Sequence, residues 1–258
     1  MEYVRLDVQD RIATVTIDRQ EKLNALNPDV IRELGEAFDD LRDREDVGAV
    51  VLTGAGEKSF VAGADIGVLA EMDSLTGVEV SRQGQEVFRA IETFPRPVIA
   101  AVGGFALGGG CELAMCCHLR VASDNAVFGL PEVGLGIIPG YGGTIRLARL
   151  VGLGRALELT LTGMKIDAAA AERMGLVNRV TTREELPEAA RKLAGKIARN
   201  GPVALQKALE AIYHGIDTST AEAMNFESSL FGLLASTDDM REGMTAFLEK
   251  RRPEFRGS

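Results

Sequence analysis

Two glutamates in glycine-rich, apolar stretches are the residues of this sequence best suited to do chemistry. Glu112 follows three consecutive glycines, Gly108 to Gly110, in the segment GFALGGGCELA. Glu132 is the only charged residue of the segment FGLPEVGLGIIPGYGG. A carboxylate surrounded by apolar neighbours is expensive to bury unless a partner or a task compensates. Two such acids in one chain favour a general acid–base pair.

Each of these features also has a purely structural interpretation. Glu112 falls in the first turn of a helix expected over CELAMCC, where an acid complements the helix dipole. Glu132 is suited to the start of a short helix that begins at Pro131. The three glycines can serve only to let a strand and a helix pack closely. The residues alone leave these alternatives open.

The glycine run has the properties of a site for an oxygen that gains negative charge, as when a thioester carbonyl becomes an enolate. Glycine leaves its amide unshielded, so a substrate can approach the backbone N–H closely. A helix N-terminus adds unpaired N–H groups and a partial positive charge. A rigid fold fixes such donors before the reaction begins. Glu112 lies three residues beyond Gly109, about 5 Å along the helix axis.

Composition and charge exclude several classes of function. The chain has 258 residues and a net charge of −9, which argues against a nucleic-acid surface. Cys111, Cys116 and Cys117, with His118 and His214, lack the spacing of a zinc site, so we expect no metal. The cysteines are instead typical of small buried apolar residues in a reducing, cytoplasmic compartment.

Two stretches resemble other kinds of site without matching them. GAGEKS (54–59) has the wrong spacing for a phosphate-binding loop. The segment from Pro97 to Cys117 carries Glu112 as its only charge, but its glycines make it a poor membrane span. A buried strand, turn and helix fit this segment better, and no export signal opens the chain. We therefore expect no membrane partner.

The elements that must position the two glutamates alternate between strands and helices. Apolar periodicity predicts a hairpin over 3–8 and 12–18, strands at 47–54, 97–104 and 119–123, and helices at 28–41, 78–91 and 111–117. This alternation indicates an α/β fold with a parallel sheet. From about residue 140 the pattern is helical, including one long segment at 218–249, and only 176–180 is strand-like.

Four segments together resemble the crotonase, or enoyl-CoA hydratase/isomerase, superfamily, and are most similar to its short-chain enoyl-CoA hydratases. They are SFVAGADI (59–66), ALGGGCELAMCC (106–117), FGLPEVGLGIIPGYGGTIRL (128–147) and DDMREGMTAFLEKR (238–251). The resemblance implies a crotonase-like spiral of ββα repeats over residues 1–195, which carries the CoA and acyl sites. It implies a C-terminal helical region over 196–258 for oligomerisation, giving a homotrimer or a homohexamer built as a dimer of trimers.

The resemblance also implies a reaction and its residues. The substrate is an acyl-CoA thioester, with no cofactor besides the CoA of the substrate. The reaction is reversible syn addition of water to a trans-2-enoyl-CoA, giving the (3S)-3-hydroxyacyl-CoA. The amides of Ala64 and Gly109 form an oxyanion hole. Ionised Glu112 is the base toward water and protonated Glu132 delivers a proton to the α-carbon, although coupled carboxylates can exchange roles. The Gly140 amide turns toward the same water.

Further contacts follow from the same resemblance. The CoA portion is expected against the backbone of five residues, Ala25, Ala62, Ala64, Asp65 and Ile66, while Phe247 and Lys250 reach a CoA bound to the adjacent subunit. Lys22 and Lys58 are either phosphate neighbours or surface charges. Residues 67–82 and 138–142 are expected to line the acyl pocket, which Tyr141 alters. His118 is expected to be structural.

Three other functions remain to be weighed against hydration. An enoyl-CoA isomerase would keep the fold but shift a double bond, and such relatives commonly retain one of the two acids. A non-catalytic, RNA-associated relative would leave both carboxylates idle and conflicts with the acidic charge. A serine or cysteine hydrolase needs a histidine paired with an activated nucleophile, and neither His118 nor His214 lies near a candidate nucleophile motif.

Overall fold

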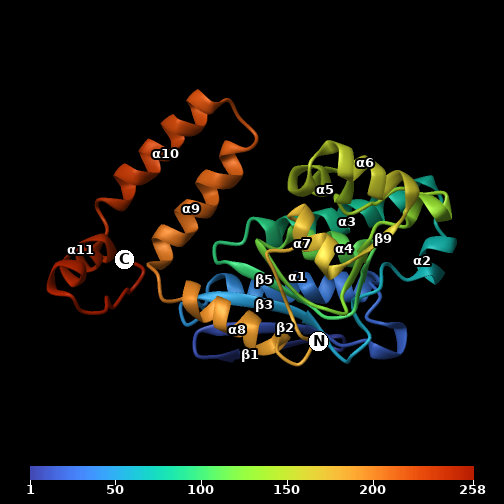
Figure 1. Cartoon of the computed structure of the whole chain (residues 1–258), viewed down its shortest axis with the longest axis horizontal. Coiled ribbons are helices and arrows are strands. Elements are labelled where there is room, and N and C mark those ends of the chain that lie inside the picture. Colours follow the sequence, from blue (N-terminus) through green and yellow to red (C-terminus); the bar gives the residue numbers. More distant parts are fainter.

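Six strands form the larger of two sheets in the computed structural model, which describes residues 1–258 (Figure 1). In spatial order they are β1 (Val4–Gln9), β2 (Ile12–Ile17), β3 (Ala49–Gly54), β5 (Val98–Val102), β7 (Leu119–Ser123) and β10 (Arg179–Thr181). The first two strands are antiparallel and all other pairs are parallel. The turn residues Asp10 and Arg11 both have positive φ, as tight hairpins require. The predicted hairpin and parallel sheet are confirmed.

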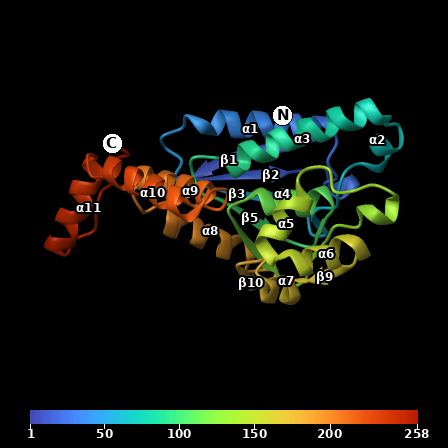
Figure 2. The ribbon, with the colours of Figure 1, turned by 90° about the horizontal axis from the view of Figure 1, so that it is seen from above.

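Alternating strand residues of the larger sheet bury both of its faces. On β3, Val50 and Leu52 pack into the main core with α1 (Pro28–Arg42) and α3 (Ser74–Glu92). Ala49 and Val51 point the other way, against α8 (Leu186–Ile197). Figure 2 shows α1 and α8 on opposite sides of the strands. This double burial explains why the strand reads as a continuous apolar run.

A second sheet of four short strands was not predicted. It contains β4 (Ser59–Val61), β6 (Phe105–Leu107), β8 (Val127–Gly129) and β9 (Lys165–Asp167), in that order. The first three strands are parallel and β9 is antiparallel to β8. Along the chain, a strand of the large sheet is followed by one of the small sheet and then by a helix: β3–β4–α2, where α2 is Ile66–Ala70, and β5–β6–α4, where α4 is Gly109–Cys116. These are the expected ββα repeats.

The helices after β8 build the wall opposite α4. A 3-10 helix, Glu132–Leu135, leads into a loop and then α5 (Gly143–Val151), α6 (Leu153–Thr162) and α7 (Ala168–Met174). Helices α4 and α5 pack against each other, as do α5 and α6. The first turns of α4 and α5 are thereby brought together. None of the helices combines the length and apolar character needed to cross a membrane.

Three C-terminal helices extend away from the layered body (Figures 1 and 2). They are α9 (Pro202–Gly215), α10 (Thr220–Leu234) and α11 (Asp238–Glu249), and α9 packs along α10. The segment 218–249, expected as one helix, divides here because Thr237 caps a new helix by accepting a bond from Met240 N at 3.1 Å. The division at 195/196 falls near the end of α8, and the role of residues 196–258 in oligomerisation stays a prediction.

Candidate active site

A single large cavity lies between α3, α4 and the segment from residue 131 to 149. It has a volume of about 1370 Å³. Both glutamates, both expected oxyanion-hole residues and Gly140 line it: Ala64, Gly109, Glu112, Glu132 and Gly140. Residues far apart in the sequence thus meet in one space. The acyl-wall expectation also agrees with the lining, which includes Leu69, Val78, Ser81, Ile138 and Tyr141.

Each glycine of the run before Glu112 meets a different neighbour. Gly108 has φ +50, and a Cβ there would lie 2.8 Å from Glu132 Oε1. A Cβ at Gly110 would collide with the main-chain carbonyl of Val61 on β4. A side chain at Gly109 would press on Leu26 and on the Tyr141 ring. The run therefore allows β4, α4 and the second glutamate to approach one another, as well as exposing a helix N-terminus.

The main chain at Ala64 is fixed by its neighbours while its own N–H is unpaired. Leu26 N donates to Gly63 O at 2.8 Å, and Asp65 N donates to Leu26 O at 2.8 Å. The Ala64 N–H has no acceptor within the chain. Gly109 is the first residue of α4, so its N–H has no acceptor within that helix. Two main-chain donors in the cavity wall are thus available to a substrate oxygen.

Glu112 is buried, with 1% of its surface exposed, and its carboxylate is held by the main chain. Oε1 accepts hydrogen bonds from Tyr141 N at 2.8 Å and from Gly143 N at 2.7 Å. Gly143 is the first residue of α5, so the carboxylate lies at that helix N-terminus. Burial raises the pKa of Glu112 to about 7; the two amides oppose this shift and the charge of Glu132 adds to it.

Glu132 has the opposite hydrogen-bonding environment. Its side chain is also buried, but Oε2 has no hydrogen-bond partner in the chain. Burial raises its pKa above the usual range. A buried carboxyl oxygen without a donor fits a protonated group that can itself donate. The two acids therefore share one site in which Glu112 is equipped to carry charge and Glu132 to carry a proton.

Comparisons with known proteins identify the family of this chain. Residues 7–258 match the family model described as enoyl-CoA hydratase/isomerase. The chain belongs to the enoyl-CoA hydratase/isomerase family. It is 50% identical to a "Short-chain-enoyl-CoA hydratase" of Clostridium acetobutylicum, over 97% of this chain and 96% of the relative. It is 48% identical to a "Crotonyl-CoA hydratase" of Syntrophomonas wolfei, over 98% of each chain.

Solved structures of this family have the same fold. The crystal structure of an enoyl-CoA hydratase from Bacillus anthracis matches with a TM-score of 0.96 and 38% identity, over 99% of this chain and 100% of that one. An enoyl-CoA hydratase structure from Geobacillus kaustophilus matches with a TM-score of 0.94 and 42% identity, over 99% and 98%. The family and the fold class predicted from the sequence are therefore confirmed.

The residues expected to contact CoA divide into two groups. Ala62, Ala64 and Ile66 line the cavity of this family member. Asp65 instead caps α2 through Gly67 N at 3.0 Å and pairs with Arg19 at 2.9 Å. Ala25, Phe247 and Lys250 are likewise absent from the lining, the last two because they lie on α11 and at its C-terminal cap. Their contacts with CoA stay predictions.

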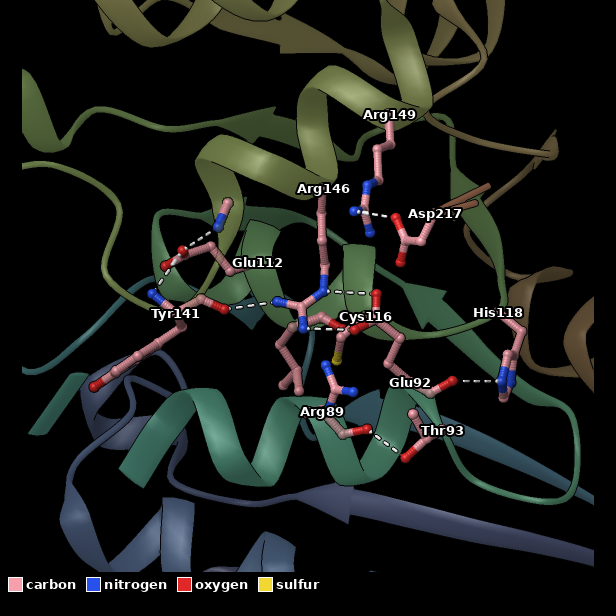
Figure 3. A network of polar contacts seen from close by, with 12 residues as sticks. Arg89, Glu92, Thr93, Glu112, Cys116, His118, Tyr141, Arg146, Arg149 and Asp217 are labelled. Carbon is pink, nitrogen blue, oxygen red and sulfur yellow. Dashed lines mark hydrogen bonds and ion pairs between the residues drawn. The ribbon is translucent and has the colours of Figure 1, made fainter. Parts of the chain in front are cut away.

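Sequence reasoning missed the side chains that fix the loop over Glu112 (Figure 3). Arg146 on α5 donates through Nη1 to Tyr141 O at 2.7 Å. Its Nε and Nη2 donate to the two carboxylate oxygens of Glu92 at 3.0 and 2.9 Å. The Gly140 carbonyl accepts from Ser81 Oγ at 2.6 Å and Gln85 Nε2 at 2.9 Å. No sequence motif predicts these contacts, because Arg146, Glu92, Ser81 and Gln85 are residue types that are common on the surface of any helix.

The cysteines and His118 are structural. Cys111, Cys116 and Cys117 are free and buried, and burial raises the pKa of Cys111 to about 12. His118 Nδ1 accepts from Val98 N at 2.8 Å, and burial lowers the pKa of this imidazole to about 4. No cluster of His, Cys, Asp and Glu side chains is arranged to hold a metal ion. None of these groups offers an activated nucleophile.

Proposed function

We propose that this protein is an enoyl-CoA hydratase that adds water reversibly, in syn fashion, to a trans-2-enoyl-CoA to give the (3S)-3-hydroxyacyl-CoA. The observation that carries the proposal is the meeting of Glu112 and Glu132 in one cavity with the amides of Ala64 and Gly109. The family membership and the hydratase names of similar proteins support it. Hydration needs an acid, a base and a stabilised thioester oxygen, and each has a counterpart in the cavity.

The thioester oxygen is proposed to bind between the N–H groups of Ala64 and Gly109. As water adds to the β-carbon, negative charge develops on this oxygen in the enolate. Two fixed donors and the N-terminal end of α4 stabilise that charge more than they stabilise the neutral carbonyl. Removing one donor of this kind typically lowers kcat about 10²–10³-fold.

The two glutamates are proposed to divide the proton transfers. Ionised Glu112 removes a proton from water as its oxygen bonds to the β-carbon. Protonated Glu132 delivers a proton to the α-carbon, which gives the hydroxyacyl thioester. One proton then returns from Glu112 to Glu132 to restore the starting state. The two amide bonds to Glu112 favour this assignment, while the pair titrates as a unit.

The remaining substrate contacts follow from the cavity. CoA is proposed to lie along the main chain of Ala62 to Ile66, and the acyl chain between residues 67–82 and 138–142. Gly140 N–H, which has no acceptor in the chain, is proposed to face the reacting water. No cofactor or metal is needed, because CoA arrives with the substrate and both proton carriers are side chains. The free cysteines support a reducing, cytoplasmic location.

The C-terminal helices are proposed to form a homotrimer or homohexamer. They expose large apolar side chains that a monomer would leave in water: Ile212, Met224, Phe231, Met244, Phe247 and Leu248. Large exposed apolar side chains concentrated on these three helices favour an interaction surface there. Phe247 and Lys250 would then approach a CoA bound to the adjacent subunit.

The deciding experiment uses purified protein and crotonyl-CoA. Hydration removes the conjugated enoyl-thioester absorbance, and chiral analysis of the product should give (3S)-hydroxybutyryl-CoA. Turnover of a 3-enoyl-CoA to the 2-enoyl isomer at a greater kcat/KM would instead assign isomerase activity. Absence of both reactions, together with RNA binding at physiological salt, would overturn the proposal.

A further inference from the structure

We propose that Arg146 is a positioning residue for hydration: its ion pair with Glu92 fixes the Tyr141 carbonyl, so that the amides of Tyr141 and Gly143 hold the Glu112 carboxylate. This inference rests on the proposed function, because it assigns Glu112 a role in proton transfer. It adds two side chains, neither of them expected to touch the substrate's reacting carbons, to the machinery of the site.

The contacts form one continuous chain (Figure 3). Glu112 Oε1 accepts from the Tyr141 and Gly143 nitrogens at 2.8 and 2.7 Å. On the other side of the same peptide segment, Tyr141 O accepts from Arg146 Nη1 at 2.7 Å. One residue, Tyr141, therefore donates to the glutamate through its nitrogen and accepts from the arginine through its oxygen. Moving the guanidinium would move both amides.

The ion pair itself is well fixed. Glu92 is the last residue of α3, and its carboxylate receives two parallel N–H bonds from the guanidinium. The exposed fractions of the two side chains are 11% for Arg146 and 16% for Glu92. The main-chain carbonyl of Glu92 also contacts His118 Nε2 at 3.1 Å, which links the end of α3 to the larger sheet. A bidentate, mostly buried pair has the rigidity that a positioning role requires.

The loop between these contacts is shaped for the arginine. Gly142 has φ +98, and a Cβ there would lie 2.5 Å from Arg146 Nη1. Next to it, a Cβ at Gly143 would lie 2.9 Å from Glu112 Oε1. The two consecutive glycines thus admit the cation on one side and the carboxylate on the other. If Arg146 served only to join α3 to α5, the loop would not need a glycine at position 143 to admit the Glu112 carboxylate.

The charges around Glu112 add to the effect of these contacts. The charged groups that act on Glu112 come from two elements: Glu132 after β8 and Arg146 on α5. The arginine favours the ionised carboxylate, whereas Glu132 opposes it. Arg146 therefore helps to keep the proposed base in its working form as well as in its working position.

The test compares Arg146→Gln, Arg146→Lys and Glu92→Gln in steady-state hydration of crotonyl-CoA across pH. We expect Arg146→Gln to lower kcat about 100-fold, as misplacement of a reacting group does, with KM changed less than about threefold because CoA contacts are untouched. The acid limb of the pH–rate profile of this variant should move to higher pH, because loss of the arginine's charge raises the pKa of Glu112. Arg146→Lys should restore the acid limb and part of kcat. In Arg146→Gln/Glu92→Gln, kcat should fall no further than in Arg146→Gln alone.

Arg191→Gln is the matched control, because it breaks an exposed pair with Asp10 remote from the cavity. It should keep wild-type kcat and KM. A crystal structure of the Arg146 variants gives a readout that does not depend on activity: the distances from Glu112 Oε1 to the two amide nitrogens should lengthen. If the wild type fails to hydrate crotonyl-CoA, the proposed function fails, and these distances still judge the positioning role.

Two outcomes would overturn the inference. The first is Arg146→Gln with kcat within threefold of wild type. The second is a variant structure in which both amide bonds to Glu112 are intact. If Arg146→Gln does not fold, Arg146→Lys and Glu92→Gln replace it in the comparison with wild type. The positioning role of Arg146 would be refuted if both variants kept the wild-type kcat and the wild-type acid limb of the pH–rate profile.

Discussion

The Glu132 carboxylate fills the space into which a side chain at Gly108 would project. A Cβ at that position would be 2.8 Å from Oε1, and φ is +50 there. Gly108, which precedes the proposed oxyanion-hole residue Gly109, thus sets the space available to the second acid. One backbone position controls two parts of the site, because the same glycine is the N-cap of α4.

Replacing Gly108 with alanine should therefore impair catalysis more than stability. The methyl group displaces Glu132 and strains a left-handed backbone, so we expect kcat on crotonyl-CoA to fall about 100-fold. Gly154→Ala is the control, since a Cβ at that position meets nothing and the residue lies in α6. Steady-state kinetics and thermal unfolding of both variants check this. Equal kcat values for the two variants would contradict the steric role of Gly108.

Each glutamate should be indispensable by itself. Glu112→Gln and Glu132→Gln keep the shape of the side chain but remove its acid–base chemistry, so kcat should fall roughly 10²–10⁴-fold in each. Because the acids act in one reaction, the double variant should be less impaired than the product of the single losses. Loss of enoyl-thioester absorbance measures all three. Turnover within a few fold of wild type in either single variant would refute the mechanism.

The rate should fall in acid as Glu112 takes up a proton. Its pKa of about 7 predicts that kcat/KM drops about tenfold per pH unit below that value. Above pH 7 the base is ionised, so protonation of Glu112 should no longer limit the rate there. A kcat/KM profile in crotonyl-CoA hydration locates the acid limb. An acid limb of the kcat/KM profile near pH 4.5 would show that burial does not raise the pKa of Glu112, the proposed base.

The same pKa makes a prediction about stability. Glu112 titrates near pH 7 when folded and near 4.5 when exposed, so the folded state binds the extra proton between these values. Its contribution to the free energy of unfolding therefore falls as pH rises from 4.5 to 7, by at most about 3 kcal/mol. Glu112→Gln can keep both amide bonds through its oxygen, so urea unfolding at pH 8 should show it at least as stable as wild type. A large loss of stability there would identify the carboxylate as structural.

Tyr141 should limit the length of the acyl chain. Its ring packs on Phe88 with centroids 5.3 Å apart and against Gly84, where a Cβ would collide with it. Tyr141→Ala should raise the ratio of kcat/KM for C8 over C4 enoyl-CoA, and Tyr141→Phe should not. Substrate series from C4 to C16 measure this. An unchanged ratio in the alanine variant would place the limit elsewhere in the wall.

The C-terminal helices should govern the oligomeric state. Phe231→Asp places a charge on an exposed face of α10, and we expect light scattering to show smaller species than the wild type. Leu161→Asp, on an exposed site of α6, is the control and should keep the wild-type mass. A wild-type protein that is already monomeric would remove the basis of the oligomer proposal.

The sequence predicted most long elements well, apart from the segment 218–249, which forms two helices instead of one, and it predicted short elements poorly. The hairpin and α1 have several apolar repeats each, so their periodicity is readable. The second sheet has strands of three residues, such as Ser59–Val61, which are too short to show alternation. Their existence depends on pairing with strands distant in sequence, as between Ser59 and Phe105.

The sequence likewise predicted some residues of the candidate site and missed others. Glu112 and Glu132 were found because an isolated acid among apolar residues is conspicuous. The amides of Tyr141 and Gly143 were missed, since every residue but proline has a main-chain donor and only the fold aims it. Arg146 was missed for a related reason: a cation on an amphipathic helix is normally a solvated surface charge.

The wall from Ile66 to Ser81 contains no residue buried in the structure, although several of its side chains face the cavity. The two glutamates assigned to proton transfer are instead buried: Glu112 lies on α4, and Glu132 is the first residue of the 3-10 helix after β8. With the acyl chain bound along this wall as proposed, substitutions there would change which tails are accepted and leave the reacting centre and the folding of the chain untouched. Such modularity offers a route by which one ancestral catalyst diversifies across substrates of different size.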